Sequence, residues 1–268
     1  MRAVLLCILL SALGSLPAHG DLSERIAILD TAITSNPDDS EALRERADLH
    51  RQHGDYQAAL DDLDRATHLA PQPVTDAFAR GRVLREAGRS FEALETLERC
   101  LSLQPDHTPA HIEAALAAAD AGQWASAAQH WDACWDRLDP LRPQQVLDRA
   151  LAHRLHAGGG PNAELAILEQ GLERLGPLPV LSEAAIQAAA AAGDVPRALK
   201  HCRSGKSRAQ RPETWLAREA DLLASIGDHE GATLCRQQAI TAIDGLPANV
   251  RARPATVRLR EELVAALR

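Results

Sequence analysis

The side chains that could do chemistry are a pair of histidines, a short glycine-lysine-serine run and a set of arginines. His153 and His156 stand three residues apart on one face of a predicted helix, a spacing that metal sites use. Two histidines without a third ligand nearby are more typical of a surface. The segment 205–207, Gly-Lys-Ser, resembles the end of a phosphate-binding loop, but Lys200 stands where that loop requires its first glycine. The sequence therefore predicts no enzyme, no catalytic residue, no cofactor and no metal site, with a metal-binding or enzymatic factor using His153 and His156 as the alternative.

The elements that must hold these side chains repeat along the chain. Glycine recurs at 34-residue steps, with one longer step where a glycine run at 158–160 intervenes, and alanine follows five positions after each glycine. The recurring residues are Gly54, Gly88, Gly122, Gly193 and Gly227, then Ala59, Ala93, Ala127, Ala198 and Ala232, and also Pro37, Pro71 and Pro105. A fixed period of this length, with a glycine turn between two helical segments, is typical of helical repeat proteins.

The best copy runs from Gly54 to Leu63, with Ala66 and Pro71 after it, and resembles the tetratricopeptide repeat family. The resemblance covers about residues 22–268 and implies an all-α, right-handed α-solenoid of about six helix-turn-helix units with N- and C-terminal capping helices. Composition agrees, because aromatic residues make up only 3% of the chain and β-sheet favours them. The predicted domains are a signal peptide at 1–20 and a single solenoid at 21–268, with repeats at 40–71, 74–105, 108–140, 144–177, 179–212 and 213–246 and a capping helix at 255–267.

The first twenty residues predict export. Arg2 is followed by an apolar run of about a dozen residues and then by small residues before Asp21, which is the pattern of a secretory signal peptide. A membrane anchor is the alternative, but a spanning helix wants about 20 apolar residues and Pro17 ends this run early. We expect cleavage before Asp21, no stable membrane insertion afterwards, and an exported protein that is periplasmic if the source is Gram-negative and otherwise secreted.

The net charge of the chain argues against one class of partner. The whole chain has a net charge of −8, and removal of residues 1–20, with one arginine and no acid, leaves 28 − 37 = −9. An acidic balance argues against nucleic acid, whose phosphates need a basic face. Only two of the 29 basic residues are lysines, Lys200 and Lys206, which favours a GC-rich bacterial genome.

The resemblance places the first helix of each repeat on the concave face, where relatives bind their partners. In the first three repeats that face would present apolar residues surrounded by arginines, and the fourth would add an arginine and the two histidines. The predicted groove residues are Arg44, Phe78, Arg82, Arg85, Ile112, Leu116, Arg149, His153 and His156. Such a strip suits a protein or peptide that carries a hydrophobic anchor and carboxylates. The alternative is that these arginines pair with neighbouring acids and only solvate the face. Those acids are Glu41, Asp48, Glu86 and Glu113.

Four cysteines follow the signal segment, namely Cys100, Cys134, Cys202 and Cys235. Equivalent positions in adjacent repeats are separated by about 8–10 Å, too far for a disulfide, so buried thiols are expected, with Cys202–Cys235 as the best candidate bridge. Taken together, the sequence predicts a non-catalytic scaffold or adaptor of the bacterial cell envelope that binds a protein or peptide partner on the concave face. A self-assembling structural solenoid is a further alternative.

Overall fold

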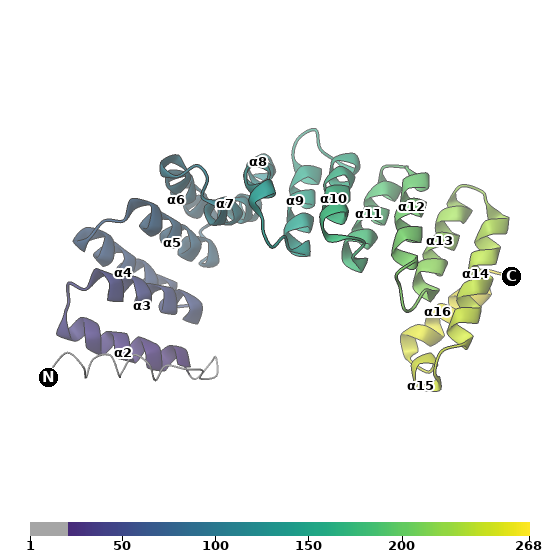
Figure 1. The fold of residues 1–268 in the computed structure, drawn as a ribbon, viewed down its shortest axis with the longest axis horizontal. Helices are drawn as coiled ribbons and strands as arrows, with labels where there is room; N and C mark the ends of the chain where they lie inside the picture. The colour runs from purple at the N-terminus through teal and green to yellow at the C-terminus, as the bar shows by residue number, and fades with distance from the viewer. Residues whose placement is uncertain (1–20) are drawn as a thin grey trace. The chain divides into compact units, whose positions relative to one another are not determined.

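The computed structural model describes residues 21–268, and these form helices joined by short turns, with no strand among them (Figure 1). The helices are α2 (Asp21–Ser35), α3 (Ser40–His53), α4 (Tyr56–Leu69), α5 (Pro73–Glu86), α6 (Ser90–Leu103), α7 (Thr108–Asp120), α8 (Trp124–Cys134), η2 (Trp135–Arg137), α9 (Pro143–Leu155), α10 (Pro161–Leu175), α11 (Pro179–Ala191), α12 (Val195–Lys206), α13 (Glu213–Ser225), α14 (His229–Asp244), α15 (Ala248–Arg251) and α16 (Pro254–Ala265). The predicted signal segment at 1–20 lies outside the described residues. Across residues 21–268, every helix is too short or too polar to span a bilayer.

The chain divides into two compact units, residues 1–136 and 137–268. Within each unit, helices that follow one another in the chain pack in antiparallel pairs, such as α3 with α4 and α13 with α14. The all-α solenoid fold of helix-turn-helix repeats is thereby confirmed. One pair of helices falls within each predicted repeat, and α15 is a short helix that the sequence did not predict.

Glycine makes the turn inside each pair. Gly54 ends α3 in the left-handed region, with φ of 91°, and its N–H donates to Arg51 O while the N–H of Asp55 donates to His50 O. A side chain at this position would be strained, which is why glycine recurs there. The helix that follows is capped by aspartate at two of the turns, where Asp194 and Asp228 accept backbone N–H bonds.

Small residues let paired helices approach closely. Alanines fill the buried interface between α7 and α8, and Trp131 is buried beside them at 1% exposure. Among the glycines of residues 21–136, Gly81 on α5 has the closest neighbour, because a Cβ atom there would stand 2.5 Å from Leu97 Cγ on α6. The core therefore depends on short side chains at fixed repeat positions, as the 34-residue pattern predicts.

The four cysteines are buried free thiols. Cys100 donates to Val74 O at 3.5 Å, and Cys202 donates to Trp215 O at 3.3 Å. Burial, and after it the nearby Glu219, raises the pKa of Cys202 to about 11. The prediction of buried thiols is confirmed, and Cys202 and Cys235 form no disulfide.

Candidate partner-binding surface

The first helices of the three repeats in unit 1 lie next to one another. Helix α5 contacts α3 on one side and α7 on the other, and together the three helices present one surface, which we call the A-helix face. Residues that share a place in successive repeats therefore meet as neighbours on this face. Five of the nine predicted groove residues lie on α5 and α7, and Arg44 lies on α3.

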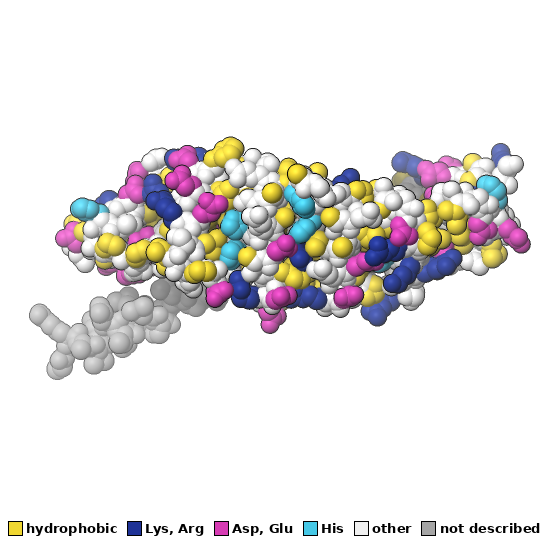
Figure 2. Space-filling view, turned by 90° about the horizontal axis from the view of Figure 1, so that it is seen from above, with side chains coloured by type: hydrophobic (Ala, Val, Ile, Leu, Met, Phe, Trp, Pro, Cys, Tyr) yellow, Lys and Arg dark blue, Asp and Glu magenta, His cyan; other side chains and the backbone are white. Residues whose placement is uncertain are grey.

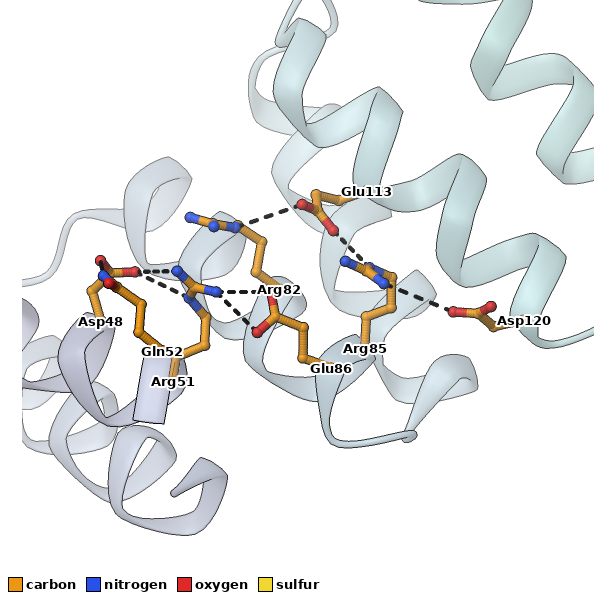
Figure 3. A network of polar contacts seen from close by, with 8 residues as sticks. All are labelled: Asp48, Arg51, Gln52, Arg82, Arg85, Glu86, Glu113 and Asp120. Carbon is orange, nitrogen blue, oxygen red and sulfur yellow. Dashed lines mark hydrogen bonds and ion pairs between the residues drawn. The ribbon is translucent and has the colours of Figure 1, made fainter. Parts of the chain in front are cut away.

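A ladder of ion pairs crosses the A-helix face (Figure 3). Arg51 on α3 bonds Asp48 in its own helix at 3.0 Å and Glu86 on α5 at 2.8 Å. Arg85 on α5 bonds Glu113 on α7 at 2.7 Å and lies 4.0 Å from Asp120. These contacts join neighbouring repeats and give both arginines carboxylate partners, so the pairing alternative holds for Arg85.

Arg44 is a fixed structural group. Its Nε donates to Asp76 Oδ1 on α5 at 2.8 Å, and its guanidinium also reaches Glu41 and the carbonyl of Ala70. Burial alone would raise the pKa of Asp76, but hydrogen bonds from Arg44 and from the N–H of Gln72 outweigh it and lower that pKa. Arg44 therefore holds repeats 1 and 2 together, and few of its donors remain for a partner.

Arg82 is the least committed arginine of the group. Its Nε lies 3.6 Å from Glu113 Oε1, longer than a good hydrogen bond, whereas Arg85 Nε lies 2.7 Å from the other oxygen of the same carboxylate. The Arg82 side chain is 30% exposed, and its guanidinium carbon stands 5.6 Å from the centre of the Phe78 ring. Phe78 is half-buried and also contacts the ring of His107 at 4.8 Å. Arg82 is thus held in place while its donors stay available.

A small apolar pocket opens beside Arg82, between α3 and α5. It encloses about 150 Å³. Its walls combine apolar and charged side chains from the two helices, with Leu63 of α4 in the lining. The lining residues are Arg44, Ala47, Asp48, Arg51, Leu63, Thr75, Asp76, Ala79, Arg82 and Val83. The arrangement suits one apolar side chain, with a carboxylate nearby for Arg82.

The other predicted apolar groove residues, Ile112 and Leu116, are half-buried on α7 and do not line this pocket. Among the predicted groove residues, only Arg44 and Arg82 line the pocket, and its apolar lining, which is Ala47, Leu63, Ala79 and Val83, was missed. A signal was present, because the short side chains of Ala47 on α3 and Ala79 on α5 leave space between the two helices.

The remaining predicted groove residues lie in unit 2. Arg149 is only 7% exposed and donates to Gln170 on the paired helix at 2.8 Å, which places its guanidinium inside the repeat. The rings of His153 and His156 lie 5.6 Å apart, and His156 Nδ1 contacts Ala157 O at 2.9 Å. Within residues 21–268, no group of three or more His, Cys, Asp or Glu side chains is placed to hold a metal ion.

Comparison with known proteins finds a similarity to one family of helical repeats. The model of the tetratricopeptide repeat family matches residues 18–72 and 78–143. The chain is 32% identical over 107 residues to the tetratricopeptide repeat and J domain-containing co-chaperone DNJ1 of Fusarium oxysporum f. sp. lycopersici; the match covers 38% of this chain and only a fifth of the length of that relative.

Solved structures share the fold at low sequence identity. A tetratricopeptide repeat protein from Parabacteroides merdae aligns with a TM-score of 0.54 and 17% identity, over 91% of this chain and 93% of its own. The C-terminal part of a TPR repeat-containing protein from Cytophaga hutchinsonii aligns with a TM-score of 0.61 and 13% identity, over 85% and 95% of the two chains. Likenesses at this level establish the architecture.

Proposed function

We propose that this chain is a tetratricopeptide repeat protein and a non-catalytic scaffold that binds a protein partner through its A-helix face. The support is the match of the family model to residues 18–72 and 78–143, because proteins with these repeats generally mediate protein–protein interactions. The observation that carries the proposal is the pocket between α3 and α5 with Arg82 at its edge. The bound segment would place one apolar side chain in the pocket and one carboxylate against Arg82.

The charge ladder supports a narrow contact. Arg44, Arg51 and Arg85 already have carboxylate partners at 3.1 Å or less. A ligand that competed for them would have to leave Asp76, Glu86 or Glu113 unpaired, which costs free energy. Arg82 can accept a second carboxylate without such a loss, so the proposed specificity rests on one cation and one apolar pocket.

Selection from a random peptide library displayed on phage tests this proposal. We expect enrichment of peptides in which an apolar residue lies close to Asp or Glu. Replacement Arg82→Gln removes the cation and should weaken the selected peptides about tenfold, since a hydrogen bond to a charged group contributes about 1.5–3 kcal/mol. Replacement Ala79→Trp should fill the pocket and abolish binding.

The matched control is Arg89→Gln. Arg89 is exposed at the turn before α6, and within residues 21–268 its side chain pairs only with Glu92, so its loss should leave peptide affinity unchanged. Peptides selected without acidic residues, or equal binding by the Arg82 and Arg89 variants, would contradict the assignment of Arg82.

We also propose that this scaffold works in the bacterial cell envelope after export. The support is the signal-like pattern of residues 1–20, with the predicted cut before Asp21. Fusion of the chain to a phosphatase that folds only outside the cytoplasm should give active enzyme in bacteria, and mass spectrometry of the exported product should find Asp21 at its N-terminus. An inactive fusion, or an intact Met1, would end the envelope assignment.

A further inference from the structure

Charge is divided unevenly between the two units. Residues 21–136 hold ten arginines against 22 carboxylates, a net charge of −12, whereas residues 137–268 hold 18 arginines and lysines against 15 carboxylates, a net charge of +3. The basic excess is concentrated at 195–212, which holds six Lys or Arg and no acid. On the face drawn in Figure 2, basic side chains gather over the part of the chain that includes α11–α13. Opposite charge on two parts of one chain favours contact between copies.

Helix α12 presents these cations as a stripe. Arg197, Lys200 and Arg208 are exposed at steps that place them on one side of the helix and of the turn that follows it. Arg197 pairs with Glu169 on α10 at 2.9 Å. The side chains of Lys200 and Arg208 form no ion pair or hydrogen bond within residues 21–268. We call these three residues the basic stripe.

A groove runs beside the basic stripe. It lies between α10 and α12, encloses about 340 Å³ and is lined in part by Leu172, Pro177, Arg197 and Lys200. Glu173 on α10 also lines it, so an acidic ligand would be repelled from that wall and held along α12. The groove can therefore take an apolar group while the basic stripe binds carboxylates.

Helix α6 in unit 1 presents the complementary features. Phe91, Glu95 and Glu98 are exposed at steps of four and three residues, which place them on one face. Phe91 is 66% exposed, the highest value among the large hydrophobic residues of 21–268 that lie at the surface. Glu95 and Glu98 have no ionic partner in the part of the chain that the structure describes. We call these residues the acidic stripe.

We propose that copies of this chain associate head to tail, with the acidic stripe of one copy on the basic stripe of the next. Phe91 would enter the groove beside Leu172 and Pro177, and Glu95 and Glu98 would face Lys200 and Arg208. The two surfaces differ, so one copy of a pair keeps a free basic stripe and the other keeps a free acidic stripe, and the assembly can grow. The two stripes attract each other through opposite surface charges, so the contact weakens with salt, and the overall negative charge of the chain keeps it reversible.

Sedimentation velocity of the full chain over a concentration series tests this directly. At low salt the weight-average mass should rise with concentration beyond that of a dimer, and at high salt it should fall toward the monomer. The double replacement Lys200→Glu with Arg208→Glu should raise the dissociation constant at least tenfold, as should Glu95→Lys with Glu98→Lys. Phe91→Ala should weaken association without any change of charge.

A charge swap separates this contact from a general effect of net charge. A chain that carries both reversed stripes should regain association, because each reversed stripe again meets its opposite. The matched control Arg258→Glu with Arg268→Glu alters net charge by the same amount at exposed cations of the C-terminal part and should leave association close to that of the unmodified chain. A chain that stays monomeric at low salt, or a swapped chain that does not recover, would overturn the proposal.

Discussion

Arg46 offers a sharp test of how unit 1 is held together. In the family that this chain resembles, the position of Arg46 prefers leucine, so a charged side chain there demands an explanation. Its Nε and Nη2 atoms donate to both carboxylate oxygens of Asp62 at 2.7 and 2.6 Å, and its Nη1 donates to Asp30 at 2.7 Å. These hydrogen bonds raise the pKa of Arg46, and the contact with Asp62 makes the largest contribution. The fork joins α3 to α4 and α2.

The replacement Arg46→Ala would leave Asp62 charged in a place that is only 4% exposed. Removing one partner of a buried ion pair typically costs 3–5 kcal/mol. The Arg46 side chain is 16% exposed, so some water reaches the site and the lower end of that range applies, about 3 kcal/mol. Asp30 is 53% exposed and adds less than about 1 kcal/mol. The double replacement Arg46→Leu with Asp62→Leu should recover most of the loss, because apolar side chains of similar volume substitute well for buried pairs.

Urea unfolding followed by tryptophan fluorescence measures the effect in the correct unit. Trp124, Trp131 and Trp135 lie in the first unit and Trp215 in the second, so a Trp215→Phe background reports on residues 21–136 alone. We expect Arg46→Ala to shift this transition and to leave the Trp215 signal of the unmodified background in place. A loss below about 1 kcal/mol for the single variant, or a double-leucine variant as unstable as the single one, would refute the reasoning.

Three further predictions follow from packing and burial. Gly81→Ala should destabilise unit 1 by about 1–2 kcal/mol in urea unfolding, because overpacking against buried Leu97 costs more than the roughly 1 kcal/mol that alanine gains in helix propensity. A variant more stable than the unmodified chain would contradict this. Burial, and after it the charge of His111, lowers the pKa of His130 from 6.5 to about 4, so the stability that is present above pH 6.5 should be lost as the pH falls from about 6.5 to about 4. The melting temperature of His130→Gln should fall less over that window, and parallel melting curves for the two proteins would argue against this. The four cysteines are buried, so they should resist alkylation in the folded protein at pH 8 and react at once in urea. Fast labelling of Cys202 in the native state would contradict this.

The sequence was most informative where backbone conformation demands one residue type. A left-handed turn needs glycine, so Gly54 and its successors marked the turn inside each helix pair, and small residues five positions later marked the closest packing. Repeat 4 was less well specified, because Gly158–Gly160 replaces a single turn glycine and shifts the register of α9. Arg149 was placed in the groove on that register, whereas its side chain is buried against Gln170.

The pairing of charges was harder to foresee, because partners on adjacent first helices are separated by about one repeat in sequence. Arg51 and Glu86 are 35 residues apart, Arg44 and Asp76 are 32 apart, and Arg85 and Glu113 are 28 apart. A search for opposite charges near the repeat period would have suggested these pairs. It could not have said which of two competing arginines holds a shared acid, since that depends on side-chain geometry.

That competition is what gives the A-helix face a specific place for a ligand. Arg82 and Arg85 both approach Glu113, but Arg85 Nε lies 2.7 Å from Oε2 whereas Arg82 Nε lies 3.6 Å from Oε1, so only Arg85 makes a short contact with this carboxylate. Short ion pairs therefore join Asp48, Arg51 and Glu86, whereas Arg82, next to the pocket between α3 and α5, has no such short contact within residues 21–268. If Glu113→Gln frees both arginines, it should broaden the peptides selected toward more acidic sequences, whereas a face that serves only for solvation would select the same weak set before and after the change.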